Sequence, residues 1–278
     1  MDKIIDLGND IARLWQGNAD KYIDGAWSTI VLAVIGTLIG CIIGLGCGIL
    51  QTIPVSKSDN IFKKVLPKIL RAVLRIYVEV FRGTPMILQA VFVYFALPYF
   101  SGNAVRLDVI TASYLVVSIN TGAYMAETVR GGILSIDIGQ TEGAKAIGMT
   151  HFQTMLHVIL PQTLRNILPQ IGNNLIINIK DTSVMFIIGY TELFAVHKGI
   201  VGATYLFFPS AVICMAVYLI MTVICSLLLR WWERAMDGPD NYDVTTTDAL
   251  AHTSGMYNFP GRTDEILSGK KGRKAAKR

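Results

Sequence analysis

Charged residues are scarce in this sequence. Asp, Glu, Lys and Arg account for 16% of its 278 residues, whereas soluble domains carry about 25%. Hydrophobic residues account for 52%, and the mean hydropathy is +0.47. The shortage of charge and the apolar excess argue against a soluble domain, and together they predict an integral membrane protein.

Motifs for several kinds of chemistry are missing as well. The sequence has no G-x-x-x-x-G-K-[ST] phosphate loop, because "SGKKGRK" near the C-terminus lacks its spacing. It has no H-E-x-x-H or C-x-x-C, and His151 and His157 do not share a helix face as zinc ligands at i and i+4 would. The apolar runs lack the series of Asp, Glu and His that forms a proton relay. We therefore expect no metal, cofactor or ATPase activity in this chain itself.

Cysteine is rare, and each cysteine falls in an apolar run: Cys41, Cys47, Cys214 and Cys225. This placement is typical of buried thiols that pack as small apolar groups, not of disulfides or metal ligands. The first 24 residues do not resemble a cleaved signal peptide, because they carry five aspartates and lead into a run too long for an h-region.

Four stretches contain no charged residue: 25–56, 83–105, 109–126 and 199–229. A helix that spans the hydrocarbon core needs about 20 mostly apolar residues, so these stretches predict four spans. Residues 171–196 predict a fifth, although Lys180, Asp181 and Glu192 interrupt them. Without that fifth span, the last span and the basic tail after it would end on the wrong side.

Lysine and arginine are unevenly distributed over the loops. One side would hold most of them, at Lys57, Lys63, Lys64, Lys68, Arg71, Arg75, Arg130, Lys145, Arg165 and the tail "GKKGRKAAKR". The other side would hold only Arg106 and Lys198. Positive loops face the cytoplasm, so the N-terminus is expected outside and the C-terminus in the cytoplasm. The predicted parts are an external segment 1–24, a transmembrane domain 25–232 and a basic tail 233–278, which is either solvated or bound to anionic lipid.

Two patterns predict local structure near the first two spans. Glycines recur at intervals of four in the first span, at Gly36, Gly40, Gly44 and Gly48, and this spacing predicts a close helix-packing face. Before the second span, a polar stripe at Lys68, Arg71, Arg75, Glu79 and Arg82 indicates an amphipathic helix. Thr84 and Pro85 are typical of an N-cap and a first helical residue, so the chain should break near Gly83. The striped helix either lies at the cytoplasmic interface or takes part in gating.

The segment 139–162, "GQTEGAKAIGMTHFQTMLHVILPQ", predicts two helices joined by a tight corner. Gly148 is suited to end the first helix in the left-handed conformation, and Thr150 with Gln153 forms a capping-box pattern for the second. Pro161 would fall at the far end of that second helix. An apolar face could be supplied by Ala144, Ile147, Phe152, Met155, Leu156 and Ile159. A cytoplasmic corner of this kind, on a membrane protein without its own motor, favours a docked partner.

The same segment resembles the EAA loop of bacterial ABC importer permeases, whose pattern is E-A-A-x3-G-x9-I-x-L-P. It reads Glu142, Gly143, Ala144, Gly148, Val158, Leu160 and Pro161 here. Two positions depart from the pattern, and Gly143 in place of alanine could loosen the first helix by up to about 1 kcal/mol. The blocks "YVEVFRGTP", "GAYMAETVRGGI" and "LPQTLRNILPQIGNNLIINIKDTSV" resemble the polar amino-acid branch, the histidine/glutamine/arginine type.

The resemblance implies an all-α integral membrane protein with the type I ABC importer transmembrane fold. That fold has about five transmembrane helices plus cytoplasmic coupling helices. The implied function is that of the membrane-spanning subunit of an ATP-driven amino-acid importer in the bacterial cytoplasmic membrane. The implied partners are a second permease subunit, two cytoplasmic ATPase subunits that use ATP and Mg, an external binding protein, a polar amino acid and the lipid bilayer, with no nucleic acid. The implied ATPase-coupling residues are Glu142, Ala144, Gly148, Phe152, Leu160 and Pro161.

Polar side chains at helical spacing inside the spans are candidates for a substrate path, because such groups are costly in lipid and tend to face bundle interiors. They are Asn120, Tyr124 and Glu127 in the third span, and Asn174, Asn178, Lys180, Asp181 and Glu192 in the fourth. Hydrogen bonding between helices would explain the same residues, and Glu192 could be a gate or a structural partner.

Two other functions compete with this interpretation. The first is an ATP-independent secondary transporter of a small polar solute. Five spans without a visible repeat argue against it, because such transporters are often built from duplicated halves. The second is a scaffold or receptor without transport, which would leave the polar residues in the spans unexplained.

Overall fold

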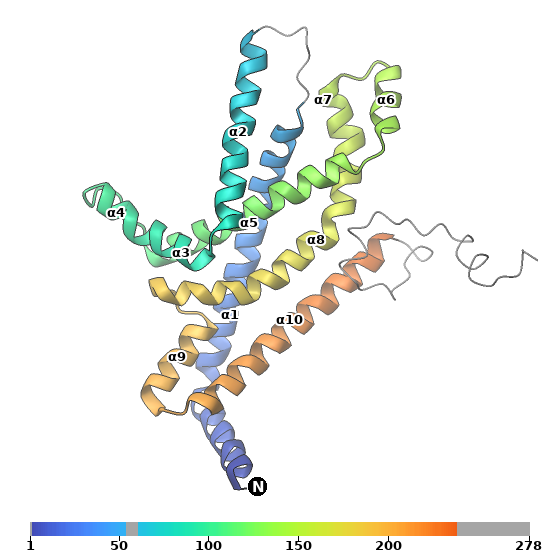
Figure 1. The fold of residues 1–278 in the computed structure, drawn as a ribbon. Helices are drawn as coiled ribbons and strands as arrows, with labels where there is room; N and C mark the ends of the chain where they lie inside the picture. The colour runs from blue at the N-terminus through green and yellow to red at the C-terminus, as the bar shows by residue number, and fades with distance from the viewer. Residues whose placement is uncertain (1, 54–60, 238–278) are drawn as a thin grey trace, which may run out of the picture. The chain divides into compact units, whose positions relative to one another are not determined.

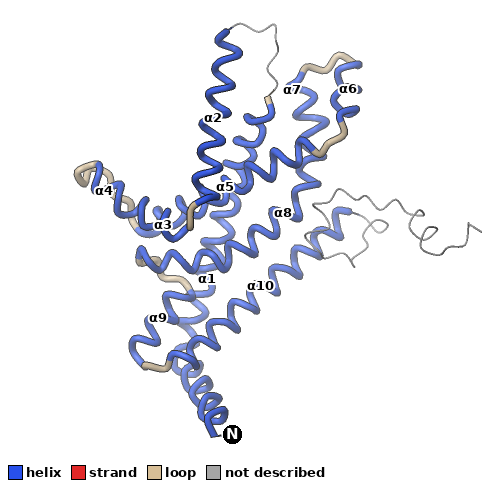
Figure 2. Tube along the Cα trace, in the orientation of Figure 1, coloured by secondary structure: helices blue, strands red, loops and turns tan. Residues whose placement is uncertain are grey.

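The computed structural model describes residues 2–53 and 61–237, and within these residues every element is helical (Figures 1 and 2). Contacts divide the chain into two units, residues Met1–Glu233 and Arg234–Arg278, and the first contains the helices discussed below. Most of the predicted basic tail, residues 238–278, lies outside the described residues.

The helices follow one another as α1 (Asp2–Thr52), α2 (Ile61–Gly83), α3 (Met86–Val91), the π-helix η1 (Phe92–Ala96), α4 (Leu97–Phe100), α5 (Val109–Leu134), α6 (Ile138–Ala146), α7 (His151–Thr154), the π-helix η2 (Met155–Ile159), α8 (Leu160–Asp181), the 3-10 helix η3 (Thr182–Ile188), α9 (Leu193–Thr204) and α10 (Phe207–Asp237). Three of them are long and apolar enough to cross a membrane: α1, α5 and α10. Two bent helix pairs raise the number to as many as five.

Helix α1 runs from the expected external segment into the first span without a break. No proline, the residue that most strongly interrupts a helix, occurs in the sequence before Pro54. The boundary expected near residue 24 is therefore not marked by any change of backbone conformation.

Helices α1 and α5 pack closely along the glycines of α1, as the four-residue spacing predicted. A Cβ atom added at Gly36, Gly40, Gly44 or Gly48 would come within 2.5, 2.5, 2.3 or 2.6 Å of α5, at Val117, Thr121, Met125 and Val129. Small residues allow this approach, and it aligns the two helices over about three turns. Asp108 is the N-cap of helix α5, and its carboxylate accepts a hydrogen bond from the Thr111 amide at 3.0 Å. Hydrogen bonds from Thr111 lower the pKa of this carboxyl.

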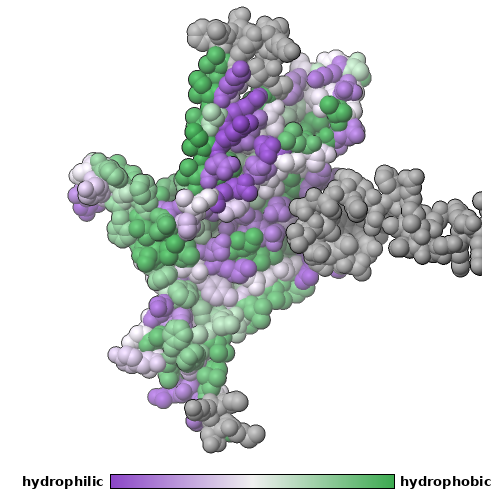
Figure 3. Space-filling view, in the orientation of Figure 1, coloured by the Kyte–Doolittle hydropathy of each residue, from purple (hydrophilic) through white to green (hydrophobic). Residues whose placement is uncertain are grey.

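Buried side chains form three clusters between these helices. One joins α1, α8, α9 and α10, a second joins α1, α3, α5 and η3, and a third joins α5, η2 and α8. The four cysteines are free thiols; Cys214 is buried, as expected of all four, and the other three are half-buried. Helix α2 is amphipathic, and Figure 3 shows its hydrophilic stripe along one side and apolar residues along the other.

The predicted second span, residues 83–105, is not one straight helix. The chain bends by 111° between α2 and α3, and the helical run beyond the bend ends at Phe100, short of the about 20 residues of a straight span. The break lies near Gly83 as predicted, but Pro85 is the N-cap and not the first helical residue. The Thr84 hydroxyl instead donates a hydrogen bond back to the Val80 carbonyl at 2.7 Å.

The predicted span 171–196 is also broken. Helix α8 passes into η3, and Gly189 then takes a left-handed conformation with φ +92° before α9 begins. The two helical parts are bent by 52°.

The corner between α6 and α7 has the predicted geometry. Gly148 has φ +83°, its N–H donates to the Lys145 carbonyl at 2.9 Å, and the Met149 N–H donates to the Ala144 carbonyl at 3.1 Å. These two bonds form a Schellman motif, which satisfies the last carbonyls of α6. Thr150 and Gln153 form the predicted capping box.

Pro161 does not end the second helix of the corner. Residues from His151 to Ile188 form one helical run, and the π-helix η2 lies directly before the proline. A π-helical turn is a common way to disturb the regular ladder of hydrogen bonds, and it lets the helix continue through a residue that has no N–H. The corner is therefore joined to α8 by a continuous helical run.

Candidate functional site

A cavity of about 680 Å³ lies between α2, α5 and α8. Six of the eight predicted path residues line it: Asn120, Tyr124, Glu127, Asn174, Asn178 and Asp181. They come in two sets with i, i+4, i+7 spacing, one on α5 and one on α8, so each set occupies one helix face. The two faces meet across the same cavity.

Residues around the break between α2 and α3 also line the cavity, and the sequence analysis did not assign them to it. Residues 82–86 all take part, and Arg82 is the cationic one. Its only sequence signal was its position at the end of the polar stripe. Thr128 and Gln170 complete the polar lining, one turn or less from residues that the periodicity had found.

The charges of the cavity are partly unpaired. Glu127 forms an ion pair with Arg130, which is three residues along α5. The Arg82 guanidinium lies 5.5 Å from the centre of the Tyr124 ring, a cation–π contact that leaves its N–H donors free of hydrogen bonds to described residues. The Asp181 carboxylate likewise accepts no hydrogen bond from a described side chain or amide. Arg82 and Asp181 thus form no close ion pair with a described residue, although each has an opposite charge nearby, Glu127 beside Arg82 and Lys180 beside Asp181.

Two of the cavity amides also hold helices together. The Asn178 amide nitrogen donates to the hydroxyls of Thr37 at 2.7 Å and Thr121 at 2.9 Å, which joins α8 to α1 and α5. The Asn120 amide nitrogen donates to the Phe81 carbonyl and to Gln89. Each of these side chains therefore lines the cavity while its nitrogen donates to another part of the protein, so the expected hydrogen bonding between helices is present.

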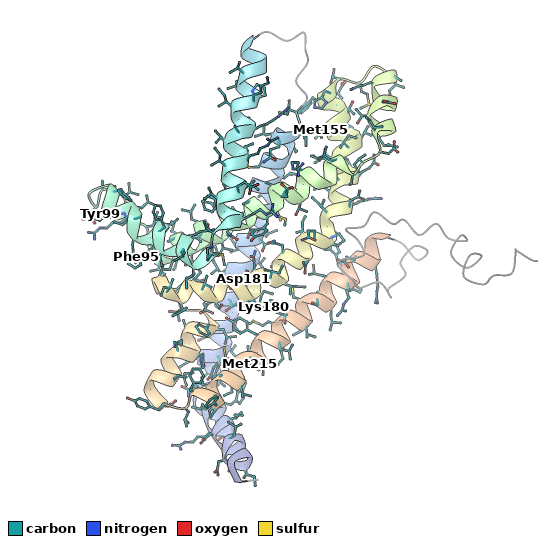
Figure 4. All side chains as sticks on the ribbon, viewed as in Figure 1. Phe95, Tyr99, Met155, Lys180, Asp181 and Met215 are labelled. Carbon is teal, nitrogen blue, oxygen red and sulfur yellow. The ribbon has the colours of Figure 1, made fainter. Side chains whose placement is uncertain are left out.

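Glu192 and Lys180 do not line the cavity. The Glu192 side chain is 0% exposed, and its carboxylate caps α9 by accepting hydrogen bonds from the amides of Phe194 and Ala195, both at 2.7 Å. The Tyr218 hydroxyl donates a third at 2.9 Å. In this structure the carboxylate oxygens of Glu192 are occupied by bonds within the protein, which favours the structural alternative. Lys180 is exposed beside Asp181 at the end of α8 (Figure 4).

The apolar face expected on the corner divides into an inner and an outer half. Ala144 and Ile159 are buried against the rest of the protein. Ile147 and Phe152 are 79% and 72% exposed, and Leu156 is exposed beside them. Of the other predicted coupling residues, Glu142 and Pro161 are exposed and Leu160 is half-buried. The outer half is an unpartnered apolar surface in the described part of the chain.

Across residues 2–53 and 61–237, no group of three metal-ligating side chains lies close enough together to hold an ion.

Comparison with known proteins defines the class. Residues 61–238 match the family described as binding-protein-dependent transport system inner membrane component, and the chain belongs to this family. It is a multi-pass membrane subunit of an ABC importer with the type I importer transmembrane fold, as the EAA-loop resemblance predicted.

Individual relatives are similar over most of the chain. The glutamine transport system permease protein GlnP of Escherichia coli (strain K12) is 38% identical over 214 residues, which cover 77% of this chain and 92% of that protein. The probable amino-acid permease protein YxeN of Bacillus subtilis (strain 168) is 35% identical over 64% of this chain and 80% of that one. A crystal structure of an amino acid ABC transporter with histidines has a TM-score of 0.69 at 33% identity, and covers 79% of this chain and 96% of that chain.

Proposed function

We propose that this chain is the permease subunit of an ATP-driven importer of a polar amino acid, and that the cavity is part of the translocation path. The observation that carries this proposal is one polar cavity lined by both a cation, Arg82, and a carboxylate, Asp181, neither of which forms a close ion pair with a described residue. A free amino acid carries a carboxylate and an ammonium group, so it needs one cationic and one anionic partner. Relatives that are named for glutamine and amino-acid transport support the same substrate class.

The corner 139–162 would couple this path to ATP hydrolysis by two separate cytoplasmic ATPase subunits that bind ATP and Mg. Its exposed apolar half, with Ile147, Phe152 and Leu156, is a surface of the kind that protein interfaces bury. The continuous helical run from the corner into α8 would transmit motion of the ATPase to Asn174, Asn178 and Asp181. A second permease subunit and an external binding protein would complete the importer.

The expected orientation has the N-terminus outside and the corner in the cytoplasm. In Figure 1 the end of α1, the start of α2 and the α6–α7 corner lie toward one end, and α9 lies toward the other with the N-terminus. A single cysteine at exposed Gln153, in a cysteine-free background, should resist an impermeant maleimide in intact cells and react in inside-out vesicles. A cysteine at Gln16 should behave in the opposite way. Labelling of position 153 from outside would reverse the orientation.

Substitution of the two unpaired charges tests the substrate path. We expect Asp181→Asn and Arg82→Gln each to raise the KM for amino-acid uptake by about tenfold or more, since each removes a charge-assisted hydrogen bond to substrate. Lys198→Gln is the matched control, because Lys198 is exposed on α9 and does not line the cavity. Uptake and the amount of inserted protein are measured on the complete complex in proteoliposomes.

Two outcomes would contradict the proposal. Unchanged KM in both charge variants would remove the cavity from the path. Uptake that persists without ATP and without the ATPase subunits would support the alternative of an ATP-independent secondary transporter of a small polar solute.

A further inference from the structure

The break between α2 and α3 leaves one backbone carbonyl without its usual partner. In a continuous helix the N–H of residue 85 would donate to the Phe81 carbonyl, but Pro85 has no N–H. A carbonyl left without a donor in the protein costs free energy unless another group donates a hydrogen bond to it. Two side chains do so: Gln89 Nε2 donates to this carbonyl at 2.9 Å, and Asn120 Nδ2 donates to it at 3.1 Å.

Gln89 makes further bonds around the same break. Its Nε2 lies 3.0 Å from the Thr84 carbonyl and 2.9 Å from the Thr84 hydroxyl oxygen, and its Oε1 accepts from Asn120 Nδ2 at 3.0 Å. The Thr84 hydroxyl donates its own proton to Val80, so it can only accept from Gln89. Gln89 is 7% exposed, and its polar atoms are all satisfied here. We call Phe81, Thr84, Gln89 and Asn120 the break latch.

The break latch joins the end of α2, the start of α3 and the middle of α5. Residues 82–86, between its members, line the cavity, whereas Gln89 does not. We propose that Gln89 is a positioning residue, which through the break latch fixes the bend and so directs Arg82 into the cavity. This proposal rests on the proposed function in one respect only, namely that Arg82 binds the carboxylate of the substrate.

Uptake kinetics test whether Gln89 acts through Arg82. In the complete complex in proteoliposomes, with radiolabelled L-glutamine as probe, Gln89→Met should raise KM by about tenfold and Arg82→Gln by a similar factor. The double variant should raise KM by no more than about tenfold, because Arg82 is already misplaced in Gln89→Met. Independent roles would instead multiply the two increases in KM to about a hundredfold. A KM for Gln89→Met equal to wild type, or a multiplicative double variant, would overturn the proposal.

Two further variants keep the test decisive. Ser113→Ala removes a different buried hydrogen bond of α5, to the Val109 carbonyl, and should leave KM unchanged. If Ser113→Ala raises KM as much as Gln89→Met does, the effect of Gln89 is one of general stability, and the proposed positioning role is refuted. If Gln89→Met does not insert, Gln89→Glu replaces it, because it retains the acceptor for Asn120 and loses the amide donors.

A second measurement does not depend on transport. Gly83 lines the cavity and has open space at its Cβ position, so Gly83→Cys in a cysteine-free background should be tolerated. We expect Gln89→Met to change the rate at which a hydrophilic thiol reagent labels this cysteine, and Ser113→Ala to leave it unchanged. An unchanged rate in Gln89→Met overturns the positioning role. If the parent complex imports no glutamine but the labelling rate changes, the break latch stands and only its link to glutamine transport falls.

Discussion

A Gly148→Val variant should insert into the membrane normally and lose most of its amino-acid uptake. Gly148 has φ +83°, and forcing a residue with a side chain into the left-handed region costs about 1–2 kcal/mol. That cost is too small to prevent insertion, which the apolar helices drive, but the corner can relieve it by changing the angle between α6 and α7. Ile147 and Phe152, on either side of the turn, would then no longer meet the ATPase together.

Among the described residues of this chain, backbone strain is the change that Gly148→Val introduces, and a second variant at the same position separates it from contact of the new side chain with a partner. A Cβ at Gly148 would meet nothing within 4 Å, so a clash cannot explain the effect. Gly148→Asn is the matched control, because asparagine tolerates the left-handed conformation and should retain uptake. Uptake, ATP turnover and retention of the ATPase are measured together on the reconstituted complex. Full uptake by Gly148→Val would refute the corner mechanism, and failure to insert would assign Gly148 to folding.

Gly44→Val should strongly destabilise the membrane bundle. A Cβ at Gly44 would lie 2.3 Å from the Met125 Cβ, and 2.7 and 2.8 Å from backbone atoms of Met125 and Ala126. Because backbone atoms cannot rotate away, α1 and α5 must separate. Overpacking of this kind costs about 1–3 kcal/mol, and the separation would also open the neighbouring glycine contacts.

Gly46 provides the control within the same helix turn. A Cβ there meets nothing within 4 Å, so Gly46→Val carries the same change of side chain without the clash. We expect Gly44→Val to lower the melting temperature of the detergent-solubilised protein by several degrees more than Gly46→Val, since about 1 kcal/mol shifts it by roughly 2–4 °C for a chain of this size. Equal melting temperatures for the two variants would show that the α1–α5 contact is looser than described.

Local features of the site could be predicted from the sequence because they depend on neighbours within one or two helical turns. The Schellman motif at Gly148 and the capping box at Thr150 each involve residues within a few positions. The spacing of Asn120, Tyr124 and Glu127 places them on one face of α5 whatever surrounds it. Pro161 misled the prediction because a proline usually ends a helix, and the π-helix η2 that accommodates it has no simple sequence signal.

The cavity required contacts between residues far apart in the chain. Arg82 enters it through a bend of 111°, and the hydrogen bonds at that bend join Asn120 to Phe81 and Gln89, which are 39 and 31 residues away. Glu192 does not line the cavity for a similar reason, because its partners are also set by the tertiary structure. Tyr218, 26 residues further on, and the start of α9 occupy its carboxylate.

The sequence by itself determined that this is a helical membrane protein with a glycine packing face on α1 and a helix–corner–helix segment, because charge content, helical periodicity and capping are local properties. Only the tertiary structure decided which polar groups converge on the cavity. A buried polar group without a partner is costly, so it forms a hydrogen bond with whichever helix lies opposite. The partners of Asn120, Asn178 and Glu192 are therefore set by contacts that no short stretch of sequence encodes. Arg82 and Asp181 also line that cavity, and they are the charges that the proposed path would offer to a substrate.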